Sequence, residues 1–165
     1  MRRFITLLVA LVLCAGATTT NAQVTRYQGE VYIAGGYGIG NNPLNRLQLH
    51  TIQGARVGEC FSTGVDLGGR RIIKNIESGL FMIPLFADFK LYAPTRSGFD
   101  PYLMVDIGYS ICPQETQLKG PMFGGGLGFK AGAFNLSVGY HLQQLVVQGI
   151  SFNMSALQLK LGVAF

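Results

Sequence analysis

The last nine residues of the chain, LQLKLGVAF from Leu157 to Phe165, alternate strictly between large apolar side chains and small or polar ones. The apolar positions are Leu157, Leu159, Leu161, Val163 and Phe165. Because successive side chains of a strand leave on opposite faces, this pattern predicts a strand with one wholly apolar face. A free terminus is normally polar and frayed. We therefore expect this strand to be held in a sheet up to its final aromatic residue.

The opposite end of the chain has the composition of a secretory signal peptide. Arg2 and Arg3 precede an apolar run from Phe4 to Ala17, and small residues follow it. The run is shorter than the roughly 20 residues that a membrane helix needs. Thr20 and Ala22 match the positions before a cleavage site, so we predict cleavage after Ala22. This divides the chain into a signal peptide, 1–22, and a mature domain, 23–165.

The composition of the chain favours a single membrane domain built from strands. The formal net charge of the 165 residues is +5, and loss of Arg2 and Arg3 would reduce it to +3, which is too mild to indicate nucleic acid. Hydrophobic residues make up 48% and charged residues only 13%. The mature sequence nevertheless contains no apolar run of helix-spanning length. Such hydrophobicity, spread as alternation, is typical of membrane strands.

Eight segments of the mature sequence alternate in this way and are separated by turn residues. They are Glu30–Ile39, Leu47–Gln53, Cys60–Leu67, Ile83–Tyr92, Tyr102–Ile111, Met122–Lys130, Phe134–Leu142 and Leu157–Phe165. The fourth is the clearest, with Leu85 and Phe89 on one face and Asp88 and Lys90 on the other. Helical periodicity is absent after residue 22. We predict an all-β protein.

The connections between these segments alternate in length. Short turns are expected at 55–59, 95–101 and 131–133, and longer loops at 40–46, 68–79, 112–121 and 143–153. Outer-membrane barrels have short periplasmic turns and longer external loops. With an even number of strands, both termini would then lie on the periplasmic side.

Comparison of the two faces indicates which one lies outside. One face carries Leu, Val, Ile, Phe and Tyr, and the other carries Gly, Ser, Asn, Asp, Lys and His. A soluble lipid-binding barrel would place the apolar face inside, but eight strands enclose too narrow a lumen for so many large residues. We therefore expect the apolar face to meet lipid. Aromatic residues near the strand ends would form the interfacial girdles: Tyr37, Tyr109, Phe129, Phe134 and Phe165.

The polar face predicts a network of charges inside the barrel. Its members are Glu30, Asp66, Asp88, Lys90, Asp106, Lys130 and Lys160. Unpaired charges are costly in a narrow interior, so these groups should pair. We expect Asp88 and Asp106 at similar heights beside Lys90, and Glu30 with Lys160 across the closing seam. A structural network is favoured over a conduction path, because eight strands seldom leave an open lumen.

The sequence offers no catalytic, cofactor or metal site. His50 and His141 are the only histidines, and both fall on inward positions. Membrane-embedded lipid A deacylases use a His with a Ser two residues later, but Ile52 and Gln143 occupy those positions here. A hydrogen bond inside the lumen is the expected role of each histidine. No spacing typical of a metal site is present.

Three further features receive structural predictions. Cys60 and Cys112 are expected at opposite ends of the barrel, about 25 Å apart, which excludes a disulfide. The glycines of GGGLG, Gly124–Gly128, should permit close approach in a curved sheet and not bind phosphate. The charged segment 68–79 is expected as an external loop. Its Arg70, Arg71 and Lys74 would either contact the phosphates of lipopolysaccharide or simply be solvated.

Three segments, LQLKLGVAF, IPLFADFKLYA from Ile83 and PYLMVDIGYS from Pro101, resemble the small outer-membrane β-barrel family of Gram-negative bacteria. This family is often labelled porin-like or OmpA/OmpX-like. The resemblance implies a monomeric, eight-stranded, antiparallel, up-and-down transmembrane β-barrel. It also implies that the barrel-assembly machinery reads the terminal strand, where Leu161, Val163 and Phe165 match the family signal. The chain has no segment matching the peptidoglycan-binding domain of the longer members.

These patterns predict a non-enzymatic outer-membrane barrel with a structural role or one exercised by its surface loops. The expected partners are outer-membrane lipid, lipopolysaccharide and, during biogenesis, the assembly machinery. One alternative is a narrow passive channel for small solutes. A further alternative is a lipid-modifying enzyme embedded in the outer membrane.

Overall fold

The computed structural model describes residues 25–40, 43–75, 78–114, 118–147 and 150–165. The predicted signal peptide and its cleavage site lie outside this part of the chain. Regular structure in the described ranges is entirely β-strand. Among these residues there is no helix long and apolar enough to cross a membrane.

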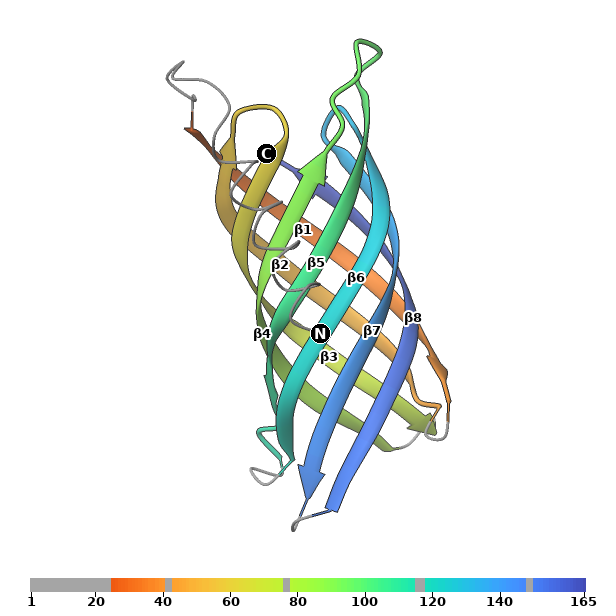
Figure 1. Ribbon diagram of the computed structural model, residues 1–165. Coiled ribbons are helices and arrows are strands. Elements are labelled where there is room, and N and C mark those ends of the chain that lie inside the picture. Colours follow the sequence, from red (N-terminus) through yellow and green to blue (C-terminus); the bar gives the residue numbers. More distant parts are fainter. Residues whose placement is uncertain (1–24, 41–42, 76–77, 115–117, 148–149) are drawn as a thin grey trace, which may run out of the picture.

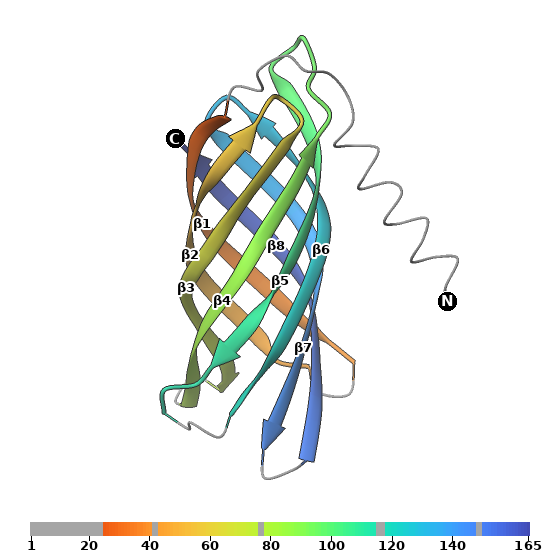
Figure 2. The ribbon, with the colours of Figure 1, turned by 60° about the vertical axis from the view of Figure 1, so that its left-hand side comes forward.

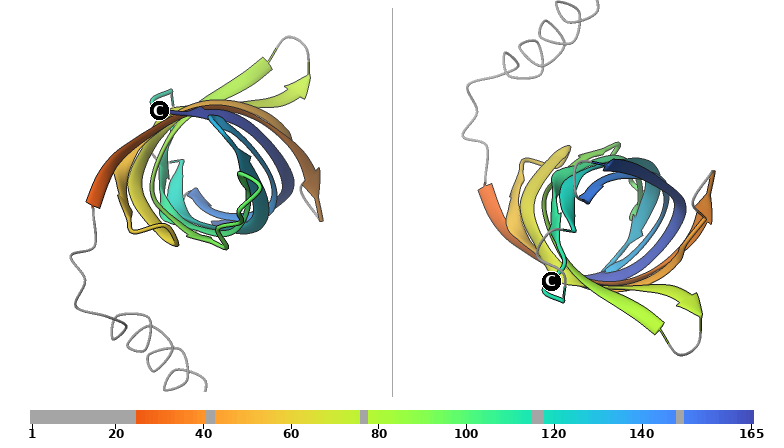
Figure 3. Two further views of the ribbon diagram at one scale, coloured as in Figure 1. Left: turned by 90° about the horizontal axis from the view of Figure 1, so that it is seen from above. Right: turned by 90° about the horizontal axis from the view of Figure 1, so that it is seen from below.

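Eight strands follow one another along the chain: β1 (Thr25–Ile39), β2 (Asn45–Val57), β3 (Phe61–Asn75), β4 (Ser78–Tyr92), β5 (Phe99–Ile111), β6 (Lys119–Ala131), β7 (Phe134–Val147) and β8 (Ile150–Ala164). Each pairs antiparallel with its sequence neighbours, and β8 pairs with β1 to close the barrel. The strands are tilted around the barrel axis (Figure 1), and the end-on views show the closed ring (Figure 3). The predicted eight-stranded up-and-down barrel is confirmed.

The apolar face of every strand lies on the outside of the barrel. In β8, for example, Leu159 is 56% exposed and Leu161 is 53% exposed, whereas the intervening Lys160 is 5% exposed. In β1 the same alternation separates exposed Val31 and Ile33 from buried Tyr32. An apolar exterior around a polar interior is the arrangement of membrane barrels and the reverse of soluble ones.

The strands are longer than predicted, and two of the predicted long loops are wrong. Residues 68–75 continue β3, 78–79 begin β4, and most of 143–153 belongs to β7 and β8. Backbone hydrogen bonds between neighbours need no apolar side chain, so the ladders continue after the apolar pattern ends. Strands of 13–15 residues exceed the 9–11 or so that span a bilayer. Figure 2 shows the β7–β8 hairpin extending past its neighbours.

The two ends of the barrel differ in what they contain. Thr25, Phe165 and the β2–β3, β4–β5 and β6–β7 connections lie at one end, which we call the terminal end (Figure 1). The other four connections lie at the opposite end, the hairpin end. At the terminal end Phe165 closes the seam, because its backbone exchanges two hydrogen bonds of 2.9 Å with Gly29. Its aromatic ring lies over this glycine, where a Cβ atom would be 2.5 Å from the ring.

Glycines on the inner face make room for large neighbours. A Cβ atom on Gly108 would lie 2.2 Å from the Cβ of Phe86, and one on Gly124 would lie 2.5 Å from the ring of His141. Phe86 and His141 stand directly opposite these glycines on the adjacent strands. The expected role of the Gly124–Gly128 segment in close approach therefore agrees with the packing at Gly124.

Candidate functional site: the lumen of the barrel

The lumen is filled by three layers of side chains, whose order follows from the positions along β2 and β3. From the terminal end toward the hairpin end, β3 places Asp66, then Arg70, then Ile72 on its inner face. On β2 the same direction runs through His50 to Arg46. We call these levels the acid–lysine layer, the arginine layer and the apolar cap.

Lys90 forms one centre of the acid–lysine layer. Its Nζ lies 2.5 Å from Glu30 Oε2 and 3.5 Å from Asp88 Oδ1. All three side chains are at least nine-tenths buried. One ammonium group therefore binds two carboxylates, Glu30 on β1 and Asp88 on β4. The ion pair of Lys90 with Glu30 joins β4 to β1 across the lumen.

Lys160 forms the other centre. Its Nζ donates a hydrogen bond of 2.8 Å to Asp106 Oδ2, and His141 Nε2 lies 3.2 Å from the same oxygen. The ammonium group also lies 5.0 Å from the centre of the Tyr32 ring, within the range of a cation–π contact. Because Asp106 faces Asp88 directly across β4 and β5, the two lysine centres are adjacent.

The predicted pair of Glu30 with Lys160 is wrong. At the seam Glu30 stands opposite Ala164, and Lys160 stands opposite Ala34. Matching heights from the ends of β1 and β8 ignores the stagger that barrel closure imposes on neighbouring strands. The stagger moves the two side chains to different levels, and each takes a partner from elsewhere on the wall.

Asp66 is bound by a histidine and a tyrosine in place of a lysine. Its Oδ1 lies 2.7 Å from His50 Nδ1, and its Oδ2 accepts a hydrogen bond from the hydroxyl of Tyr32. The Tyr32 and His50 rings stack with centroids 5.1 Å apart. Both histidines are only 2% exposed and face the lumen, so neither reaches the lipid-facing surface.

Lys130, the remaining member of the predicted charge network, is separate from these centres. It lies on β6 near the terminal end, opposite Asp100 and Asn135 on the adjacent strands. Within the described ranges it forms no ion pair. It is half-buried near the mouth of the barrel, where water can solvate its ammonium group in place of a carboxylate.

Arg70 lies inside the barrel and not in an external loop, which corrects the predicted contact with lipopolysaccharide. It is 1% exposed, and its Nε donates to Gln48 Oε1 at 2.8 Å. Its Nη1 donates to Gln143 Oε1 at 2.7 Å. Arg71, the next residue, is exposed on the outer face between Leu47 and Phe81. The side chain of Lys74 lies outside the described residues.

Arg46 is a lumen residue that the sequence reasoning missed. It is 3% exposed, and its side chain crosses the inner surface of Gly36. The sequence contains a signal for this position, because the alternation of Gln48, His50 and Ile52 continues back to Arg46. The predicted strand began at Leu47 because the prediction followed the apolar face alone.

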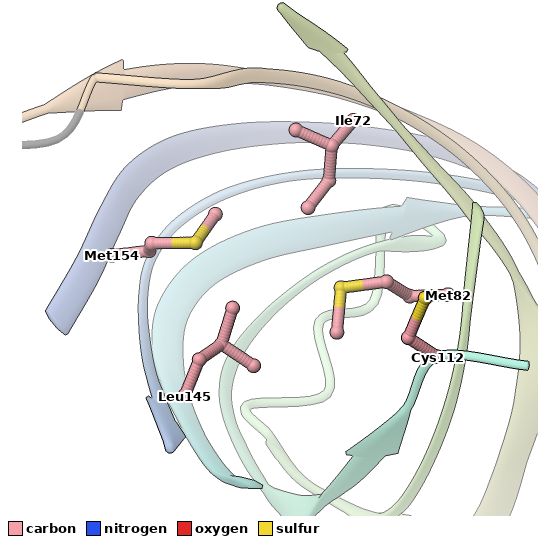
Figure 4. Close-up of a cluster of buried hydrophobic side chains, with 5 residues drawn as sticks. All are labelled: Ile72, Met82, Cys112, Leu145 and Met154. Atoms are coloured by element: carbon pink, nitrogen blue, oxygen red, sulfur yellow. The ribbon is translucent and has the colours of Figure 1, made fainter. Parts of the chain in front are cut away.

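The apolar cap closes the lumen at the hairpin end. Figure 4 shows its five buried side chains converging from the barrel wall: Ile72, Met82, Cys112, Leu145 and Met154. Met82 and Cys112 are both 0% exposed, and three partly buried leucines pack against the cluster. Cys112 is therefore far from Cys60, which is exposed at the terminal end, and both thiols are free, as predicted.

The acid–lysine layer contains a small cavity. It has a volume of about 10 Å³, which is room for about one water molecule, and is lined in part by Glu30, Asp88 and Lys90. No group of three or more His, Cys, Asp or Glu side chains in the described part of the chain is placed to hold a metal ion. In the described part of the chain, buried polar and apolar side chains occupy the lumen from the acid–lysine layer to the apolar cap.

The sequence matches no protein-family model and no curated protein. Solved structures, in contrast, share the fold. Neisserial surface protein A has a TM-score of 0.63 at 14% identity, over 86% of this chain and 98% of the other. The outer membrane enzyme PagL has 0.58 at 13%, over 81% and 98%. The N-terminal β-barrel domain of OprF from Pseudomonas aeruginosa has 0.54 at 12%, over 86% and 100%. The chain therefore has the fold of the small eight-stranded outer-membrane β-barrels.

Proposed function

We propose that the protein is a monomeric, integral outer-membrane barrel with a closed lumen, and that its role is structural or exercised by its hairpin end. The observation that carries this proposal is the packing of the lumen. Buried side chains fill the acid–lysine layer, the arginine layer and the apolar cap in succession. In this respect the interior resembles the core of a globular protein more than a pore.

The location follows from the exterior. Large apolar side chains are exposed on all eight strands, and aromatic residues lie near both ends, including Tyr37 and Tyr109 toward the hairpin end and Phe134 and Phe165 at the terminal end. Lipid is the solvent that suits such a surface. We place the terminal end in the periplasm and the hairpin end outside the cell.

The burial of both histidines supports a non-enzymatic role. PagL shows that this fold is compatible with an enzyme, but the likeness concerns the fold alone. Here His50 and His141 are buried in the lumen and hydrogen-bonded or adjacent to carboxylates. A lipid acyl group at the outer surface would have no access to either ring.

The second candidate is a narrow channel, which is favoured by the charged side chains in the lumen. Conductance of the refolded protein in planar bilayers separates the two. We expect no discrete conductance steps above the bilayer background from the wild-type protein, with a porin of about 16–18 strands, which has an aqueous channel, as positive control. Steps that scale with salt concentration would contradict the closed lumen and favour the channel.

Two exposed features support the partners that we propose at the membrane surface. Arg71 lies on the outer face toward the hairpin end, where its guanidinium would reach the phosphates of lipopolysaccharide. Loss of thermal stabilisation by lipopolysaccharide in Arg71→Ala, but not in Arg96→Ala at the terminal end, would test this contact.

Leu161, Val163 and Phe165 expose an apolar row at the end of β8. We propose that the assembly machinery reads this row.

A further inference from the structure

The arginine layer contains two buried positive charges without an acidic partner. Arg46 is 3% exposed and Arg70 is 1% exposed. In the described part of the chain neither lies within 4.0 Å of a carboxylate, and every ion pair involving Glu30, Asp88 or Asp106 is made in the acid–lysine layer. A buried charge is normally paired, because removing it from water is costly.

The same layer has an excess of hydrogen-bond donors. All three guanidinium nitrogens of Arg46 are buried and make no hydrogen bond to a described residue, and the same holds for Nη2 of Arg70. Nε2 of Gln48 and the hydroxyl of Ser110 are also buried without a partner. A guanidinium group has donors only and no acceptor. What this layer lacks is therefore a negatively charged acceptor.

The strand register holds the two arginines close together. Arg46 stands opposite Ile72, and Arg70 stands opposite Gln48, on the paired strands β2 and β3. The two arginines are thus diagonal neighbours on the inner face, a relation in which Cα atoms lie about 7–8 Å apart. Long side chains at this spacing can contact one ion together.

Neighbouring amides do not supply the missing charge. Gln48 and Gln143 accept hydrogen bonds from Arg70. Gln158 has a buried Oε1 without a hydrogen bond, and it pairs with Gly36, over which Arg46 lies. An amide oxygen there would accept from one nitrogen of Arg46, but it would leave both positive charges uncompensated.

We propose that the arginine layer binds a small inorganic anion of halide size, held by Arg46 and Arg70. The size follows from the packing. Arg70, Gln48 and Gln143 are among the largest fully buried side chains, and the apolar cap covers the layer at the hairpin end. In a layer of such large buried side chains we expect room for an ion about as large as a water molecule and none for an organic anion. The proposal does not depend on whether the barrel conducts.

The test compares chloride with gluconate, an anion too large to enter the layer. Thermal unfolding of the refolded protein in detergent micelles is followed in increasing sodium chloride, with sodium gluconate keeping the ionic strength constant. A ligand that binds only the folded state raises the unfolding midpoint as binding proceeds. We expect such a chloride-specific rise in the wild-type protein and its loss in Arg46→Met.

Arg56→Met is the matched control, because Arg56 lies at the terminal end with partners of its own, Glu59 and Asp100. It should keep the chloride-dependent rise. A wild-type midpoint that does not respond to chloride, or an equal response in Arg46→Met, would overturn the proposal.

A second measurement uses the wild-type protein alone, in case Arg46→Met does not refold. Crystals grown in sodium bromide should show an anomalous-scattering peak within hydrogen-bonding distance of the Arg46 guanidinium. Bromide peaks confined to the protein surface would contradict a lumen site.

Discussion

At the scale of single residues, the lumen shows how strongly a buried charge selects its partner. Lys90 bridges Glu30 and Asp88, and Lys160 binds Asp106, although the strand ends alone suggested Glu30 as the partner of Lys160. A buried ion pair adds little net stability compared with apolar packing, but breaking it leaves an uncompensated charge. The pairs therefore determine which side chains the interior tolerates.

A double-mutant cycle tests the pairing of Glu30 with Lys90. Lys90→Met should reduce the free energy of unfolding by about 3 kcal/mol, because it leaves the buried carboxylates of Glu30 and Asp88 without their ammonium partner. Glu30→Gln should reduce it by less, because Lys90 keeps Asp88 as a partner. The double variant should lose less than the sum, with a coupling energy of about 1–3 kcal/mol. Urea unfolding of the refolded protein in detergent micelles measures these values.

The control cycle combines Glu30→Gln with Lys160→Met. These two groups take different partners in adjacent centres, so their coupling energy should be smaller than that of Glu30 with Lys90. A larger coupling energy for Glu30 with Lys160 than for Glu30 with Lys90 would restore the seam pair and contradict the observed register.

At the scale of the strand, size complementarity across each ladder shapes the narrow barrel. Large inner side chains such as Phe86 and His141 face glycines on the neighbouring strand. Because each large side chain occupies the space that its glycine neighbour leaves free, eight strands can close around aromatic residues without a wider lumen. The glycines are thus as necessary to the closed ring as the aromatic residues opposite them.

Alanine at two glycines should separate packing from strand propensity. In Gly108→Ala the new methyl group would collide with Phe86 and with the backbone oxygen of Leu85, at 2.2 and 2.3 Å. We expect a loss of about 1–3 kcal/mol in unfolding free energy, typical of overpacking. In Gly35→Ala, where the added atom meets nothing within 4 Å, stability should stay equal or rise by up to about 1 kcal/mol. Equal losses in both variants would contradict this explanation.

At the scale of the whole molecule, the contents of the lumen differ between the two ends of the barrel. The acid–lysine layer lies toward the terminal end, and the arginine layer and apolar cap lie toward the hairpin end. The two cysteines mark these ends, because Cys60 is exposed in the β2–β3 turn and Cys112 is buried in the cap. They offer a direct means of testing the proposed orientation in the membrane.

Labelling with a membrane-impermeant maleimide tests this orientation. In intact cells we expect no labelling, because Cys60 would face the periplasm and Cys112 is 0% exposed. After permeabilisation of the outer membrane, Cys60 should react and Cys112 should remain protected until the protein unfolds. A Cys60→Ser variant identifies the labelled site. Labelling of Cys60 in intact cells would reverse the orientation.

The sequence by itself determined the number of strands, their order and the side of the sheet that faces lipid. These properties depend on a local, two-residue alternation, which LQLKLGVAF and the IPLFADFKLYA strand display directly. The closed barrel then follows, because an open edge would leave backbone groups unsatisfied in lipid.

Only the tertiary structure decided which inner side chains meet. The partners of Glu30 and Lys160 and the inward position of Arg70 depend on register and on strands that continue past the apolar pattern. Stagger accumulates from strand to strand around the closed ring, so the height of a side chain in the lumen depends on all eight pairings together. No local sequence pattern contains the combined stagger of eight strand pairings. For this reason the arginine layer could be identified only in the folded barrel.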